Sequence, residues 1–134
     1  MTKINKSYNY MRQYEYLKRI ILGSTLLYIL FLVARYILNP SGDYLKELFP
    51  NEFLLWKGWH LVVFFLLGYY SPNYWYLSLF LGMLWEFTEF VIDKTDIINK
   101  LIGNNAQISL YKESDFALNS IGLILGYFFR MVTR

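Results

Sequence analysis

The stretch Trp85-Glu86-Phe87-Thr88-Glu89 places two carboxyl groups three residues apart, near the end of a long apolar segment. Residues three or four positions apart lie on one face of a helix. Ionisable groups within a membrane segment are costly and usually face a bundle interior or a water-filled cavity. The stretch therefore predicts a polar interior in a helical membrane protein. Continued in both directions, the same face forms a stripe of small and acidic residues: Ser78, Gly82, Glu86, Glu89 and Asp93.

The composition supports this class of protein. Of the 134 residues, 56% are hydrophobic, 21% are aromatic and only 17% are charged, whereas soluble domains carry about a quarter charged residues. The chain is long enough for one domain. Cysteine is absent, which excludes disulfides and thiolate metal sites. The net charge of +3 is small and the basic residues gather near the N-terminus, so no nucleic-acid partner is predicted.

Four apolar segments predict the fold class, an all-α four-helix transmembrane bundle. A span needs about 20 predominantly apolar residues. A soluble helical protein with an apolar core is the competing interpretation, which the scarcity of charge in the segments disfavours. The expected layout is a basic cytoplasmic tail at 1–19 and a single membrane domain at 17–134, with helices at about 17–38, 54–70, 74–92 and 114–132.

The distribution of charge predicts how the chain is oriented. Positive charge in the 1–19 tail favours a cytoplasmic N-terminus, and four spans return the C-terminus to the same side. The polar side chains of all four segments then fall near the extracytoplasmic end, where they would line a polar cavity. Close helix packing at Gly82, Gly122 and Gly126 would close the cavity on its cytoplasmic side. These polar side chains are Arg35, Lys57, His60, Glu86, Glu89, Asp115 and Asn119.

Three motifs resemble those of the VanZ-like family of small helical membrane proteins. They are Trp59-His60, Trp85-Glu86-x-x-Glu89 and Asp115-x-x-x-Asn119-x-x-Gly122-x-x-x-Gly126, and the resemblance covers about residues 56–130. The chain departs from the family pattern at Glu89, where VanZ-like chains usually have Gln. The resemblance implies an envelope-associated four-helix protein of a bacterial plasma membrane, and it implies no particular reaction.

Two interpretations of Glu86 and Glu89 stay open. They can form a general acid/base pair with His60 as partner, because two close carboxyl groups in a poorly solvated site titrate in separate steps. Alternatively, they can be charge-compensated by Arg35 and Lys57, since intramembrane charges normally find partners.

No metal and no cofactor are predicted. His60, Glu86, Glu89 and Asp115 could in principle bind a divalent ion, but di-iron bundles use two Glu-x-x-His motifs and this chain has a single His. Asn119 is expected either to orient a carboxyl group or to bridge two helices by a hydrogen bond.

Three functional classes follow from these residues. The first is a module that binds the polar head of a membrane lipid or lipid-linked envelope molecule, with Arg35, Lys57, Asp115 and Asn119 as ligand-binding residues. The second is a membrane enzyme acting on such a head group through Glu86, Glu89 and His60. The third is a structural or assembly protein. The binding module is preferred because no nucleophile or metal set is evident. Neither the ligand's identity nor the oligomeric state follows from the sequence.

Overall fold

The structure is a computed structural model that describes residues 3–34, 52–95 and 114–133. These residues contain four α-helices and no strand, which confirms the all-α class. A short 3-10 turn, η2, joins the second helix to the third. The elements are α1 (Lys3–Leu32), α3 (Glu52–Tyr70), η2 (Pro72–Tyr74), α4 (Trp75–Thr95) and α6 (Ser114–Thr133).

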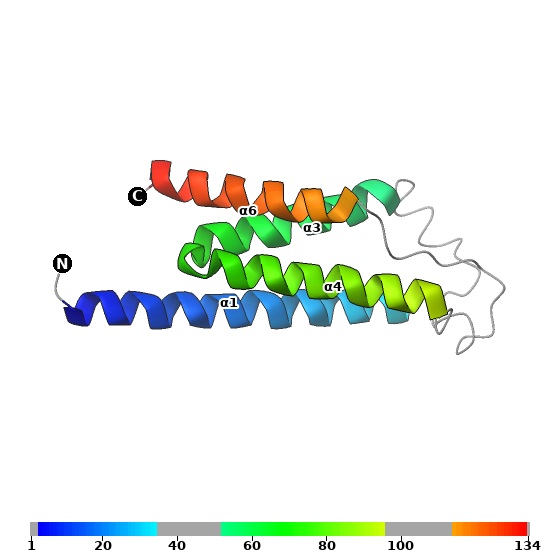
Figure 1. Cartoon of the computed structure of the whole chain (residues 1–134), viewed down its shortest axis with the longest axis horizontal. Helices are drawn as coiled ribbons and strands as arrows, with labels where there is room; N and C mark the ends of the chain where they lie inside the picture. The colour runs from blue at the N-terminus through cyan, green and yellow to red at the C-terminus, as the bar shows by residue number, and fades with distance from the viewer. Residues whose placement is uncertain (1–2, 35–51, 96–113, 134) are drawn as a thin grey trace.

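The four helices run alternately in opposite directions (Figure 1). The beginning of α1, the η2 turn and the end of α6 lie at one end of the bundle, at the left of Figure 1. Among the described helices, α3 and α6 pack against each other most extensively, whereas α4 and α1 make fewer contacts with this pair. The bundle is therefore built around the α3–α6 pair.

Glycines allow α3 and α6 to touch backbone to backbone. A Cβ atom added at Gly126 would lie 2.0 Å from the carbonyl oxygen of Phe65, and one added at Gly122 would lie 2.5 Å from that of Leu61. These two glycines confirm the predicted close packing. Gly68 on α3 allows the same close approach from the opposite helix, since a Cβ atom added there would lie 2.2 Å from the carbonyl oxygen of Leu123 on α6. Only a residue without a side chain fits at these positions.

The predicted boundaries of three helices agree closely with the structure, and the boundary of the first does not. The expected start near residue 17 is wrong, because α1 begins at Lys3 and includes most of the segment expected to be a polar tail. Tertiary contacts explain the difference. Gln13 is buried, its carbonyl accepts a hydrogen bond from Ser71 Oγ (2.8 Å), and its side chain accepts one from the backbone N–H of Asn73 (3.1 Å). These two hydrogen bonds connect the early part of α1 to the turn between α3 and α4.

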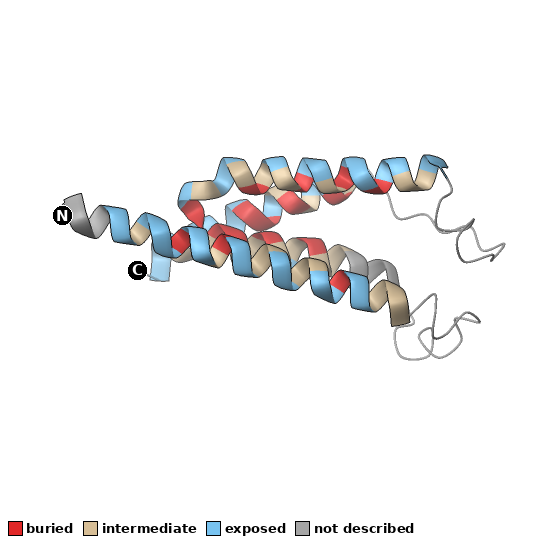
Figure 2. Cartoon of the chain, turned by 90° about the horizontal axis from the view of Figure 1, so that it is seen from below, coloured by how far each residue is buried: buried red, intermediate tan, exposed pale blue. Residues whose placement is uncertain are grey.

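The bundle is polar inside and apolar outside. More polar or charged residues than hydrophobic ones are buried among the described residues, whereas large apolar side chains cover the outward faces. Figure 2 shows this arrangement, with buried positions facing the neighbouring helices and exposed positions facing outward. Exposed apolar surface on this scale marks contact with a membrane or a partner. Examples are Leu22, Leu26, Leu30, Phe80, Phe87, Ile124, Phe128 and Val132.

Two helical segments are long and apolar enough to cross a membrane. They are Pro72–Thr95, with 24 residues, and Ser114–Thr133, with 20 residues. Only 22% of the residues in the apolar window of each segment are buried within the bundle. The core helix of a soluble protein would bury most of such a window, so both segments direct most of their apolar side chains away from the other helices.

Candidate functional site

The small-and-acidic stripe predicted on α4 is the buried face of that helix. Its buried residues are Ser78, Gly82, Glu86 and Glu89, while Asp93 at the end of the stripe is half-buried. The four residues of the motif that begins at Asp115 likewise lie on the buried face of α6. Its buried residues are Asp115, Asn119, Gly122, Leu123 and Gly126.

These two faces meet α3 in a group of buried polar side chains, which we call the acidic cluster. Helix α3 contributes His60, α4 contributes two carboxyl groups, and α6 contributes one carboxyl group and an amide. All five side chains are at least nine-tenths buried. The cluster consists of His60, Glu86, Glu89, Asp115 and Asn119.

Asn119 connects three helices at the centre of the cluster. Its Nδ2 donates a hydrogen bond to Glu86 Oε1 (2.9 Å), and its Oδ1 lies 2.9 Å from Nδ1 of His60. Because an amide oxygen can only accept, His60 donates the proton on Nδ1 to Asn119. Both roles considered for Asn119 are therefore observed, because it bridges helices and also orients the Glu86 carboxyl group and the His60 imidazole.

Glu89 is held by two donors that the sequence interpretation did not include in the site. Tyr28 on α1 donates its hydroxyl to Glu89 Oε1 (2.9 Å), and the indole N–H of Trp85 donates to the same oxygen (2.9 Å). The rings of Tyr28 and Trp85 also meet edge to face, with centroids 4.7 Å apart. The spacing of Trp85, one turn before Glu89, could have indicated its role. Nothing local identifies Tyr28, which is distant in sequence.

Asp115 lies on the other side of the imidazole. Its Oδ2 is 3.8 Å from Nε2 of His60, and its Oδ1 accepts a hydrogen bond from Ser114 Oγ (3.3 Å). On the Nδ1 side, Glu86 Oε1 is 3.5 Å from the ring. The His60 ring is therefore flanked by carboxyl groups from two different helices.

The cluster contains more acceptors than donors. Glu86 Oε2, Glu89 Oε2 and Asp115 Oδ2 are buried and accept no hydrogen bond from any described residue. No Lys or Arg among the described residues pairs with these three carboxyl groups. A buried carboxylate without a donor or a counter-charge is costly, so such groups attract a proton, a cation or a hydrogen-bond donor. The cluster is suited to binding one of these.

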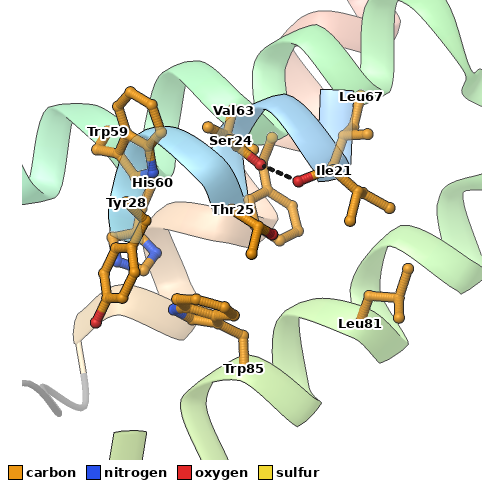
Figure 3. Close-up of a pocket in the computed structure, with 11 residues that line it drawn as sticks. Ile21, Ser24, Thr25, Tyr28, Trp59, His60, Val63, Leu67, Leu81 and Trp85 are labelled. Atoms are coloured by element: carbon orange, nitrogen blue, oxygen red, sulfur yellow. Dashed lines mark hydrogen bonds between the residues drawn. The ribbon is translucent and has the colours of Figure 1, made fainter. Parts of the chain in front are cut away.

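A cavity of about 80 Å³ lies beside the cluster, between α1, α3 and α4 (Figure 3). His60, Ser24, Thr25 and Tyr28 are its polar lining residues, and the remaining lining is aromatic or aliphatic, with Trp59 and Trp85 next to His60. The carboxyl groups of the acidic cluster are not among the described residues that line this cavity. The acidic residues lie behind a largely aromatic wall, because Trp85 and Tyr28 cover Glu89.

A second, larger hollow of about 570 Å³ lies toward the η2 end, between α4 and α6. The lining of this hollow is mostly aliphatic and aromatic. None of the five residues of the acidic cluster is among its described lining residues. The lining residues come from α1, the end of α3, η2, α4 and α6: Tyr10, Gly68, Pro72, Asn73, Trp75, Leu79, Ser120, Leu123, Ile124, Tyr127 and Phe128.

The predicted site residues fall into two groups. His60, Glu86, Glu89, Asp115 and Asn119 come together as described. Arg35 lies outside the described residues. Lys57 lies one turn before His60 on α3 and is half-buried, but the contacts of the three carboxyl groups do not include it. Charge compensation of Glu86 and Glu89 by Lys57 is therefore not seen.

Comparison with protein-family models, with curated proteins and with solved structures finds no match to the chain. The resemblance to the VanZ-like family rests on the short motifs alone. The geometry of the cluster is thus the basis for any functional conclusion.

The hydroxyl of Tyr28 provides a direct test of the cluster's geometry. Removing it by Tyr28→Phe is expected to lower the free energy of unfolding by about 1–2 kcal/mol, because Glu89 loses a buried donor while the ring contacts remain. Thermal unfolding in mild detergent, followed by helical circular dichroism, measures the change. Tyr14→Phe on the exposed side of α1 is the matched control, and equal melting of the two variants would contradict the assignment.

Proposed function

We propose that this protein is an integral membrane protein of the VanZ-like type that binds the polar head of a lipid or lipid-linked envelope molecule at the acidic cluster. The observation that carries the proposal is the set of three buried carboxyl groups, each with one oxygen that accepts no hydrogen bond from the described residues, inside a bundle whose outer surface is apolar. Hydroxyl or amine donors of a head group would satisfy these oxygens. The acyl chains would remain against the apolar outer faces.

The cavity beside His60 offers a route for the head group. A water molecule needs about 10–15 Å³ of such space, so about 80 Å³ admits a small polar group of a few atoms. Trp59, Trp85 and Tyr28 surround the opening with aromatic rings. Aromatic faces accept cationic groups well, so an amine-bearing head group matches both the wall and the carboxyl groups behind it.

All four helices are proposed to span the membrane, with both termini cytoplasmic. Basic side chains support this orientation, since the early part of α1 carries Arg12, Lys18 and Arg19 at the same end of the bundle as Arg130. Arg130 donates to the carbonyl of Tyr69, at the end of α3 (2.7 Å). Positive charge concentrates on the cytoplasmic side of membrane proteins, so in this proposal the acidic cluster lies toward the extracytoplasmic side of a plasma membrane.

The test is the lipid content of the purified protein. Glu86→Gln and Glu89→Gln keep the shape of each side chain but remove its charge. Each is expected to reduce a co-purifying lipid or lipid-linked molecule, detected by mass spectrometry, by about tenfold or more, which corresponds to losing one charged contact of about 1.4 kcal/mol. Thr88→Val is the matched control, because Thr88 lies between the two glutamates but on the exposed face.

Two other outcomes would replace this proposal. If the Gln variants bind the same molecules as the wild type and only unfold more easily, the cluster has an architectural role. If the variants retain the lipid but stop converting it, the protein is an enzyme that uses Glu86 or Glu89 with His60 as acid and base.

A further inference from the structure

A second ligand can satisfy the same buried oxygens, and its chemistry is that of a metal ion. One ring nitrogen of His60 and one carboxylate oxygen from each of Glu86 and Glu89 all lie within 4.8 Å of one another. From these contacts we propose that the acidic cluster is a binding site for a divalent first-row transition-metal ion, held by His60, Glu86 and Glu89. The site goes beyond the proposed function, because cation binding requires no lipid.

The spacing of the three side chains fits such an ion. Two ligands of a zinc-sized ion are at most about 4.0–4.4 Å apart, given metal–ligand distances of about 2.0–2.2 Å. The three ligand atoms lie within 4.8 Å of one another, so an inward shift of roughly 0.4–0.8 Å or somewhat more brings them to coordination distance. If Nδ1 of His60 is the ligand atom, its distance of 3.5 Å to Glu86 Oε1 is that of adjacent ligands, and Nδ1 then gives up its hydrogen bond to Asn119.

The surroundings of the imidazole match those of a metal-bound histidine. Such a histidine normally offers its second ring N–H to a carboxylate, a carbonyl or water. If Nε2 of His60 binds the ion, Nδ1 donates to Asn119 Oδ1 at 2.9 Å. If Nδ1 binds it, Nε2 faces Asp115 Oδ2 at 3.8 Å. Binding through Nε2 therefore keeps the observed hydrogen bond to Asn119, whereas binding through Nδ1 replaces that bond and leaves Nε2 3.8 Å from the Asp115 carboxyl group.

The burial of the two glutamates and their combined charge favour the binding of a divalent ion. Glu86 and Glu89 are 6% and 2% exposed, and each has one oxygen that accepts no hydrogen bond from the described residues. Two carboxylates neutralise one divalent ion. Carboxylates suit Mn²⁺, and imidazole suits Zn²⁺ and iron, so a site with one nitrogen and two carboxylates favours ions of this series over Mg²⁺ or Ca²⁺.

The experiment uses the full chain in mild detergent after treatment with a chelator. Mn²⁺ is added stepwise, and free Mn²⁺ is measured from its six-line electron paramagnetic resonance spectrum. We expect about one Mn²⁺ bound per chain, displaced by Zn²⁺, with an affinity at least tenfold lower in Glu89→Gln and in Glu86→Gln. Glu15→Gln, which removes an exposed carboxylate on α1, is the matched control and should bind as the wild type does.

Wild-type protein that binds no Mn²⁺, or Mn²⁺ that binds equally to the wild type and the Gln variants, would overturn the metal site. If a Gln variant fails to fold, stoichiometric and Zn²⁺-displaceable binding to the wild type decides the question on its own. The lipid content of the same preparations keeps the two proposals separate. Mn²⁺ binding with unchanged lipid in the variants rejects only the head-group proposal, and lost lipid without Mn²⁺ binding rejects only the metal site.

Discussion

Replacing Gly126 by Ala adds one methyl group to the bundle. This change is expected to destabilise the bundle more than the same change at any other described glycine. The new Cβ would lie 2.0 Å from the carbonyl oxygen of Phe65, and a backbone atom cannot move aside as a flexible side chain can. Overpacking a tight core costs about 1–3 kcal/mol, and a clash with backbone falls at or above the upper end. The expected result is an unfolding temperature in mild detergent far below that of the wild type.

Gly23→Ala is the matched control for this substitution. Gly23 also lies within a helix, but an added Cβ would meet no atom within 4 Å. Alanine is favoured over glycine in a helix by about 1 kcal/mol, so this variant should be as stable as the wild type or slightly more stable. Equal destabilisation of both variants would show that α3 and α6 are not in the described backbone contact.

The second large effect is expected from Asn119→Ala. This change removes both the hydrogen-bond donor to Glu86 and the hydrogen-bond acceptor for His60, so two buried polar groups each lose a hydrogen bond inside the bundle. Such losses cost about 1–3 kcal/mol each, so a total loss of about 2–6 kcal/mol is expected. Denaturant unfolding followed by helical circular dichroism measures the free energy of unfolding.

Ser120→Ala provides the comparison on the neighbouring residue. The hydroxyl of Ser120 bonds only the carbonyl of Phe116 within its own helix (3.0 Å), so its removal should change stability little. If Asn119→Ala unfolds like Ser120→Ala, the amide does not hold the three helices together and the geometry of the acidic cluster is wrong.

The buried faces of α4 and α6 could be predicted from the sequence because they depend only on helical spacing. The positions of Glu86 and Glu89 on α4 share a face whatever the helix packs against. The same is true of Asp115 and Asn119 on α6. In each helix these polar positions turned out to be buried together. Local periodicity therefore identified most of the acidic cluster.

The features that sequence analysis missed all depend on contacts between distant segments. The early start of α1 depends on Gln13 meeting the turn after α3, which no local pattern reveals. The role of Tyr28 depends on α1 crossing α4 at Glu89. No role was predicted from the sequence for Trp85, whose indole N–H donates to Glu89. Trp85 and Tyr28 also line the cavity beside His60, so its lining is largely aromatic.

The residues of the acidic cluster come from helices that differ in how extensively they pack against the rest of the bundle. His60 and Asn119 belong to the glycine-packed α3–α6 pair. The two glutamates belong to α4, and Tyr28, the donor to Glu89, belongs to α1; both helices pack less extensively. Any outward movement of α4 would therefore draw the glutamates away from the imidazole and the amide. Access of a ligand to the buried oxygens is expected to follow this movement.

The close pairing of α3 with α6 also affects the order in which the protein is made. The ribosome releases α1, α3 and α4 before α6. The surface of α3 at Gly68 therefore lacks its packing partner until α6 is made. Glu86 meanwhile lacks the amide of Asn119. A carboxyl group without its donor is costly in a membrane. In the proposed membrane bundle, the three-helix nascent chain therefore carries Glu86 without its Asn119 donor, and synthesis of α6 supplies that donor.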